Sequence, residues 1–195
     1  KILKVPLSRL FKDALAFVMR NLHKVQGKNG VNSPGTPEIP EQVFEELLVN
    51  ALVHRDYLVS APIRIFIFDD RVEIISPGTL PNNLTIANIK AGNSNIRNPI
   101  LISYAAKGLL PYHGIGSGIL RALKAWPDID FEDDRESSLF KAIVRRTHRP
   151  AENTGYLHQN LHQKHKICTR NKGFLMQLCA ILHRKLHQNF LRSLS

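Results

Sequence analysis

The segment from Glu46 to Asp56 constrains this chain most strongly, because it places three polar side chains on an otherwise apolar helix. Its sequence is Glu-Leu-Leu-Val-Asn-Ala-Leu-Val-His-Arg-Asp, so Glu46, Asn50 and His54 recur every four residues. On an α-helix that spacing brings the three side chains onto one face. The residues between them are Leu, Val and Ala, and a helix that is apolar on most of its surface belongs in a core. The segment therefore predicts a buried helix with a polar stripe, formed by these three residues.

The polar stripe has two interpretations. In the first, the three residues are solvated and lie at the edge of a helix. In the second, they form a site, because unpaired polar groups in a core are costly and need partners. In that site Asn50 is an oxygen ligand to a hard cation, and Glu46 is a base or a group that orients water. His54 then either contacts a phosphate or contacts the metal ligand without binding the metal itself.

Hydrophobic periodicity predicts the other elements of the fold. Helices are predicted over residues 7–26, 40–54, 99–107 and 117–126. Strands are predicted over residues 63–68, 71–76, 129–131 and 139–144. Ser8 is the expected N-cap of the first helix, and the composition of residues 27–37 indicates a loop. Helices combined with an antiparallel hairpin predict a two-layer α/β sandwich.

A second motif is glycine-rich and stands directly before a predicted helix. Gly114, Gly116 and Gly118 alternate with other residues, Ser117 among them. Glycines permit close approach to a ligand, and the start of a helix offers free N–H groups to a phosphate. The alternative is an ordinary tight turn. The spacing does not match a dinucleotide-binding fingerprint, and no Gly-x-x-x-x-Gly-Lys-Ser/Thr is present, so the sequence lacks the phosphate-binding loop of a helicase motor.

A third motif covers residues 94–99, Ser-Asn-Ile-Arg-Asn-Pro. Arg97 and Asn98 precede a predicted helix, where they could reach an anion. The alternative is that Asn98 and Pro99 only start that helix.

The charge of the chain is uneven. The formal net charge is +11, and residues 148–195 hold eight Lys and Arg residues against Glu152 alone, which is +7. Such a tail favours contact with nucleic acid, although a charge run is often only a solvated surface. We expect this His-rich tail to be helical in part or disordered. A metal site in it is not favoured, because its histidines lack Cys or carboxylate partners at matching spacing.

Composition narrows the class of protein. The apolar content of 43% suits a folded domain, and two cysteines are too few for a disulfide framework. No stretch approaches 18 apolar residues and no signal peptide precedes the domain, so a cytoplasmic protein without a membrane partner is expected. Because the chain begins with Lys1, we expect a fragment of a longer protein.

Four motifs, at residues 46–57, 68–81, 94–99 and 114–119, occur in a recognisable order. Together they resemble the ATPase-like C-terminal domain of RecG-related ATP-dependent DNA helicases and of bacterial transcriptional regulators with a Schlafen-type AlbA domain. That domain is similar to the GHKL ATPases. The resemblance covers about residues 5–147 and implies a Bergerat-type α/β sandwich that binds ATP between its helices and its sheet. By position, Glu46 matches the catalytic acid of the family.

The resemblance also assigns the remaining site residues. Asn50 matches the asparagine that ligates Mg²⁺, and the three glycines of the second motif match a phosphate-lid box. GHKL ATPases carry an Asp-x-Gly-x-Gly after the hairpin, and its Asp reads the adenine amino group. The corresponding stretch here is Ser76-Pro77-Gly78-Thr79-Leu80, which offers Ser76 and Gly78 to a nucleotide but no carboxylate. We therefore expect weak discrimination between bases.

The predicted organisation has three parts. Residues 1–30 form an N-terminal helix and linker, residues 31–147 a GHKL-like ATP-binding domain, and residues 148–195 the basic tail. The predicted function is ATP binding, with hydrolysis, in a helicase-related or DNA-binding regulatory protein. The alternative is a degenerate, non-catalytic module for oligomerisation or regulation. Expected partners are a nucleotide, a second copy of the chain, and DNA, through the tail or through a preceding part of the protein.

Overall fold

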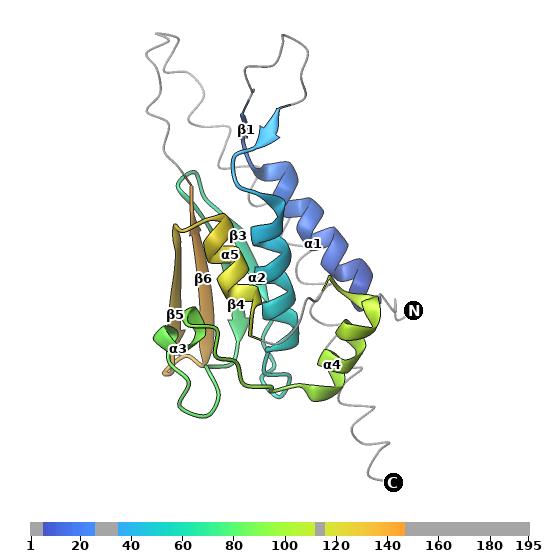
Figure 1. Ribbon diagram of the computed structural model, residues 1–195, viewed down its shortest axis with the longest axis vertical. Helices are drawn as coiled ribbons and strands as arrows, with labels where there is room; N and C mark the ends of the chain where they lie inside the picture. Colours follow the sequence, from blue (N-terminus) through green and yellow to red (C-terminus); the bar gives the residue numbers. More distant parts are fainter. Residues whose placement is uncertain (1–5, 26–34, 112–115, 147–195) are drawn as a thin grey trace.

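The computed structural model describes residues 6–25, 35–111 and 116–146. In this part of the chain a four-stranded antiparallel sheet carries its helices on one face (Figure 1). The order of the strands across the sheet is β3-β4-β6-β5. Their bounds are β3 (Arg64–Ile67), β4 (Arg71–Pro77), β5 (Ile129–Asp134) and β6 (Leu139–Arg145). The predicted combination of helices with an antiparallel sheet is confirmed.

Two hairpins build the sheet. β3 returns as β4, β5 returns as β6, and the two hairpins join where β4 pairs with β6. In that central pair Val72 lies opposite Val144 and Ile74 opposite Ala142, and all four side chains are buried. Side chains alternate between the two faces of a strand, so these four share the face that the helices cover.

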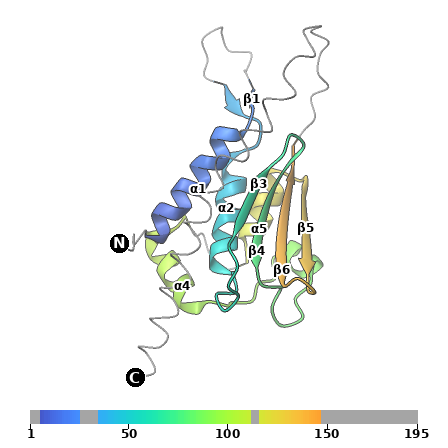
Figure 2. The same cartoon turned by 180° about the vertical axis from the view of Figure 1, so that it is seen from behind.

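The central helix of the fold is α2 (Glu41–Val53). It lies between the sheet and α1 (Leu7–Asn21), and α5 (Gly118–Ala125) packs beside it (Figures 1 and 2). It begins after Pro40, which suits the start of a helix because its N–H is missing and its φ is fixed. Because α2 is covered on two sides, it buries residues around most of its circumference, namely Val43, Phe44, Glu46, Leu47, Leu48, Val49, Ala51 and Val53.

Shorter elements complete the described part of the chain. These are β1 (Lys24–Val25), β2 (Thr36–Pro37), α3 (Ile86–Lys90), α4 (Pro99–Tyr104) and the wider-turned η1 (Ala105–Leu109). β1 and β2 pair with each other, separately from the main sheet. None of the helices in the described ranges has the length and apolar character that crossing a membrane demands.

The predicted boundaries at the N-terminal end are wrong in two places. The first helix ends at Asn21 rather than at residue 26, because Leu22 is extended and the chain then pairs as β1. Its partner β2 lies within the stretch predicted as a loop. Pro6 rather than Ser8 occupies the N-cap position, so no side chain caps this helix.

Two further differences lie between β4 and α5. α3 is a helix of five residues that was not predicted from the sequence, and its N-cap Thr85 accepts a hydrogen bond from the N–H of Asn88 at 3.2 Å. The helix predicted over residues 99–107 stops at Tyr104, and the turns widen up to Gly108, whose φ is +87°. The predicted tail, residues 148–195, and the predicted boundary at residue 30 lie outside the described residues.

Candidate functional site

An open cavity lies between α2, the helix-covered face of the sheet and the segments that surround α3 and precede α5. Its empty space, with the adjoining open solvent included, is about 980 Å³. All three residues of the polar stripe, Glu46, Asn50 and His54, line it. The structure therefore brings them together along one wall of a cavity.

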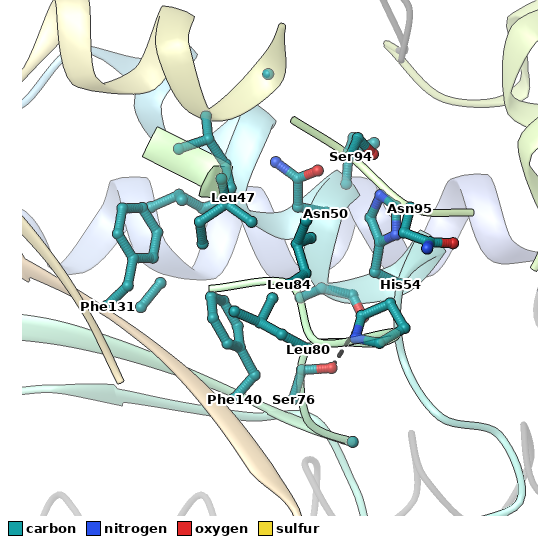
Figure 3. A pocket seen from close by; sticks show the side chains of 18 of the residues that line it. Leu47, Asn50, His54, Ser76, Leu80, Leu84, Ser94, Asn95, Phe131 and Phe140 are labelled. Atoms are coloured by element: carbon teal, nitrogen blue, oxygen red, sulfur yellow. Dashed lines mark hydrogen bonds between the residues drawn. The ribbon is translucent and has the colours of Figure 1, made fainter. Parts of the chain in front are cut away.

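The cavity has an apolar side and a polar side (Figure 3). The rings of Phe131 and Phe140 stack with their centroids 5.9 Å apart, and Leu47 lies on the same side. The labelled polar side chains on the opposite side are Asn50, His54, Ser94 and Asn95. Aromatic faces suit a flat apolar group, whereas amides, hydroxyls and an imidazole suit hydrogen-bonding groups. The cavity is thus built for a ligand with two chemically different ends.

Glu46 is held by an ion pair from the neighbouring helix. Arg121 Nε donates to Glu46 Oε1 at 2.6 Å, and Arg121 Nη2 donates to Glu46 Oε2 at 3.0 Å. The remaining nitrogen, Nη1, donates to Ser117 Oγ at 2.5 Å. The residue Glu46 is only 5% exposed, so its charge would be costly without this partner. Arg121 thereby joins α5 to α2 at the cavity.

Asn50 lies one helical turn further along α2. Its Nδ2 atom is buried and has no hydrogen-bond partner among the described residues. A Cβ added to Gly118 would lie 2.8 Å from Glu46 Oε2 and 3.1 Å from Asn50 Nδ2. Glycine at position 118 therefore lets the backbone of α5 approach both polar side chains, which a larger residue would obstruct.

His54 is the C-cap residue of α2, and its backbone N–H donates to Asn50 O at 2.9 Å. Burial lowers the pKa of the imidazole, and the nearby Arg97 guanidinium lowers it further, while a hydrogen bond with the backbone of Asn95 acts in the opposite direction. The ring is therefore neutral at pH 7. Because one ring nitrogen takes part in the hydrogen bond with Asn95, the imidazole offers its other nitrogen to a ligand and no positive charge.

Ser76 and Gly78 lie where β4 ends, and both line the cavity. Ser76 Oγ donates to the Ala51 carbonyl at 3.1 Å, so its hydroxyl joins the sheet to α2 (Figure 3). Gly78 has a φ of +102°, and a Cβ there would lie 2.6 Å from the Cβ of Asp56. Among the described residues that line the cavity, Glu46 alone carries a carboxylate.

Arg97 and Asn98 do not line the cavity, and their side chains donate to main-chain carbonyls at the C-terminal end of α2 and, for Arg97, in the loop after β4. Asn98 Nδ2 donates to the carbonyls of Val53 at 2.8 Å and Arg55 at 2.7 Å. Arg97 donates to the carbonyl of His54 at 3.3 Å and to a carbonyl of the loop after β4 at 2.6 Å. The last turn of a helix leaves such carbonyls without partners. The geometry therefore favours a structural role for both residues, and an anion contact at Arg97 stays a prediction.

The structure divides the residues of the glycine-rich motif. Gly116 and Gly118 line the cavity, whereas Gly114 lies outside the described residues. Ser117 takes the N-cap position of α5, and its hydroxyl accepts the hydrogen bond from Arg121 described above.

A second glycine faces this motif from the loop after α3. Gly116 has a φ of +84° and Gly92 a φ of +91°. A Cβ on Gly116 would collide with the carbonyl oxygen of Gly92. The two loops therefore pack backbone against backbone beside the cavity, and Gly116 is required for that contact.

Three features of the site were not predicted from the sequence: Arg121, Gly92 and the pair Phe131–Phe140. Arg121 lies one helical turn after Ser117, but 75 residues separate it from Glu46, and no local pattern links the two. The phenylalanines stand on neighbouring strands, where alternation could identify them as inward-facing but not as cavity residues. No group of three or more His, Cys, Asp and Glu residues in the described ranges could hold a metal.

Part of the chain matches a family of known proteins. Residues 60–137 match the family model described as "Putative ATP-dependent DNA helicase recG C-terminal". This match confirms the predicted resemblance to the C-terminal domain of RecG-related proteins. The matched residues run from before β3 to after β5, so α2 with Glu46 and Asn50 precedes them.

A solved structure is similar to this chain. The DIP2311 protein of Corynebacterium diphtheriae matches with a TM-score of 0.59 and 26% sequence identity. The match covers 71% of this chain but 28% of the other, so this chain spans little more than a quarter of that protein. No curated protein matches this chain.

Proposed function

We propose that this chain binds ATP in the cavity and hydrolyses it, as the ATPase-like domain of a DNA-associated protein with a GHKL-type sandwich. One observation carries the proposal. Glu46 and Asn50 of α2 converge with Gly118 of α5 at one side of a cavity whose other side is aromatic. The family model that matches residues 60–137 is described as ATP-dependent, which supports ATP as the ligand.

The two sides of the cavity give the nucleotide an orientation. The base lies against Phe131 and Phe140, because stacked aromatic rings suit a purine. The phosphates lie toward Gly116, Gly118 and the start of α5, which no side chain caps, because the first turn of a helix suits an anion. Since Glu46 alone among the described lining residues carries a carboxylate, no acid reads the base. We expect the affinities for ATP and GTP to agree within about tenfold, or ~1.4 kcal/mol.

The donor set fits a magnesium ion held jointly by protein and phosphates. Mg²⁺ prefers oxygen ligands and commonly takes only one or two from the protein in nucleotide sites. Asn50 is suitable because its amide lines the cavity and its Nδ2 is not engaged by any described residue. Asn50 Oδ1 would hold the ion, and the bound ion would neutralise part of the negative charge of the phosphates.

In the proposed hydrolysis Glu46 positions a water molecule and accepts its proton as the water oxygen attacks the γ-phosphorus. The bond between that phosphorus and the β–γ bridging oxygen breaks, so the products are ADP and inorganic phosphate. The apolar side of the cavity limits the entry of other water molecules. Gly118 has no side chain and leaves space for the attacking water beside Glu46.

The second candidate function is a non-catalytic module for oligomerisation or regulation. Two observations favour it: the loop from Ser76 to Leu80 has no adenine-reading carboxylate, and Arg121 occupies both oxygens of Glu46. Calorimetric titration of the full chain with Mg²⁺ and a non-hydrolysable ATP analogue separates binding from no binding. Phosphate release by the full chain, lost in Glu46→Gln while nucleotide binding is retained, supports hydrolysis. Binding without phosphate release assigns the module function instead.

The proposal includes DNA binding, because residues 148–195 carry a formal net charge of +7. Binding of this kind weakens steeply with salt, because cations are released from the duplex. Fluorescence anisotropy with a labelled duplex at about 50 and about 200 mM salt tests this expectation. A variant with the basic residues of the tail changed to Gln should lose most duplex binding. Unchanged binding would place the DNA contact elsewhere.

A further inference from the structure

The described lining of the cavity contains no lysine or arginine, although the proposed ligand is a polyanion. His54 is neutral, and the donors of Arg97 are used by main-chain carbonyls. The ammonium of Lys90 lies 5.8 Å from the ring centroid of Phe131, on the apolar side. Arg97 meets the polar side through the main chain of His54, whereas Arg121 meets it through the side chain of Glu46.

We propose that Arg121 is the triphosphate-binding residue of this cavity and that it binds by exchanging Glu46 for the terminal phosphate. This inference rests on the proposed function and deepens it. In the structure the guanidinium is paired with Glu46, and both oxygens of the carboxylate accept hydrogen bonds from it. When a triphosphate binds, the guanidinium turns to the phosphate and releases Glu46 to a water molecule. The ion pair thereby couples occupation of the cavity to the freeing of the base.

The geometry of the pair supports such an exchange. The guanidinium presents parallel N–H groups that match carboxylate and phosphate oxygens equally well. The side chain of Arg121 is 27% exposed, whereas that of Glu46 is 7% exposed, so the arginine is the more accessible member of the pair. A terminal phosphate also carries more negative charge than a carboxylate. Ser117, which holds the third nitrogen of Arg121, stands between Gly116 and Gly118, next to the expected phosphates.

The exchange makes an unusual prediction about Glu46. If Glu46 competes with the phosphate for Arg121, Glu46→Gln should tighten binding of a non-hydrolysable ATP analogue about three- to tenfold. Arg121→Met should weaken that binding about thirtyfold or more, with an effect on ADP below about threefold, because the terminal phosphate is lost from ADP. Arg145→Met is the matched control, since it removes a cation paired with Asp130 on the sheet, away from the cavity. It should change neither affinity.

Arg121→Met leaves a buried carboxylate unpaired and could unfold the chain, so the double variant Glu46→Gln/Arg121→Met provides the decisive comparison. Titrations with Mg²⁺ and the analogue should show that the double variant binds far more weakly than Glu46→Gln alone. Equal affinity of these two variants, or weaker binding by Glu46→Gln than by the parent, overturns the role of Arg121 while ATP binding stands. If no variant and no parent protein binds nucleotide, the proposed function fails first and the inference fails with it.

Discussion

The middle of α2 and its C-terminal end carry similar polar side chains and use them differently. At the C-terminal end, Arg97 and Asn98 donate to main-chain carbonyls, which a ligand cannot replace without unravelling the helix. In the middle, Glu46 is paired with another side chain and Asn50 Nδ2 has no described partner. A polar group bonded to the backbone is part of the scaffold. A group that is unpaired, or paired with an accessible side chain, remains available to a ligand.

One atom at the C-terminal end departs from this division. Arg55 is 3% exposed and its Nε is buried without a hydrogen-bond partner among the described residues. Its Nη2 donates to the carbonyls of Val59 and Ala61, and its guanidinium lies 4.9 Å from the ring centroid of Tyr57. Arg55 does not line the cavity, so a ligand bound there would not contact its Nε atom.

Exchanging the two asparagines for alanine gives the largest contrast between the two regions. Asn50→Ala should reduce Mg²⁺-dependent binding of the ATP analogue about a hundredfold, or ~2.7 kcal/mol, and change the free energy of unfolding by less than about 1 kcal/mol. Asn98→Ala removes a donor from two carbonyls and should cost about 2–3 kcal/mol of stability with no change in affinity. Calorimetry and urea unfolding of both variants measure this. Loss of folding in Asn50→Ala would assign it to the core instead.

A pair of glycines extends the contrast to the backbone. Gly118→Ala should weaken nucleotide binding about tenfold, because the new methyl group obstructs the space between Glu46 and Asn50. Gly108→Ala is the matched control, since a Cβ at Gly108 meets nothing within 4 Å but its φ is +87°. It should cost about 1–2 kcal/mol of stability and leave binding unchanged. If the two variants had the same effect on affinity, close approach at Gly118 would not matter.

Arg97→Met tests whether the C-terminal end of α2 is only scaffold. The variant loses two hydrogen bonds from a charged group and should be less stable by about 2–3 kcal/mol. Affinity for the ATP analogue should stay within about threefold of the parent. Because the guanidinium lowers the pKa of His54, that pKa should rise in the variant, which an NMR titration detects. A tenfold loss of affinity with unchanged stability would show that Arg97 contributes to nucleotide binding.

Tyr57→Phe should have the smallest effect at neutral pH. It removes a hydrogen bond from Tyr57 Oη to the Leu52 carbonyl at 2.7 Å, worth about 1 kcal/mol. Burial raises the pKa of Tyr57 from 10.0 to about 12, so the folded state favours the neutral phenol. This contribution is complete below pH 10.0 and is lost as pH rises toward 12. Urea unfolding at pH 8 and pH 11 should show a steeper alkaline loss in the parent than in the variant.

The sequence allowed α2, the first hairpin, the two later strands, the polar stripe and the glycines beside it to be predicted, because their signals are local. Spacing of four residues fixes a helical face, and alternation fixes which side of a strand is buried. The partner of Glu46 could not be predicted in this way, because Arg121 meets it only when α5 packs on α2. Arg97 was misleading for a related reason: its charge indicates an anion, and only the structure shows the carbonyls that it caps.

The pairing of β4 with β6 also dictates when the site can form. Val72 pairs with Val144, and the hairpin that supplies β6 is the last described part of the sheet along the chain. Contacts between such distant residues are slow to form, because a long loop must close first. During synthesis, α2 therefore emerges long before the strands and helix that cover it, and its apolar surface is exposed to other chains. The same helix that bears the polar stripe is thus the segment in which we expect premature self-association to begin.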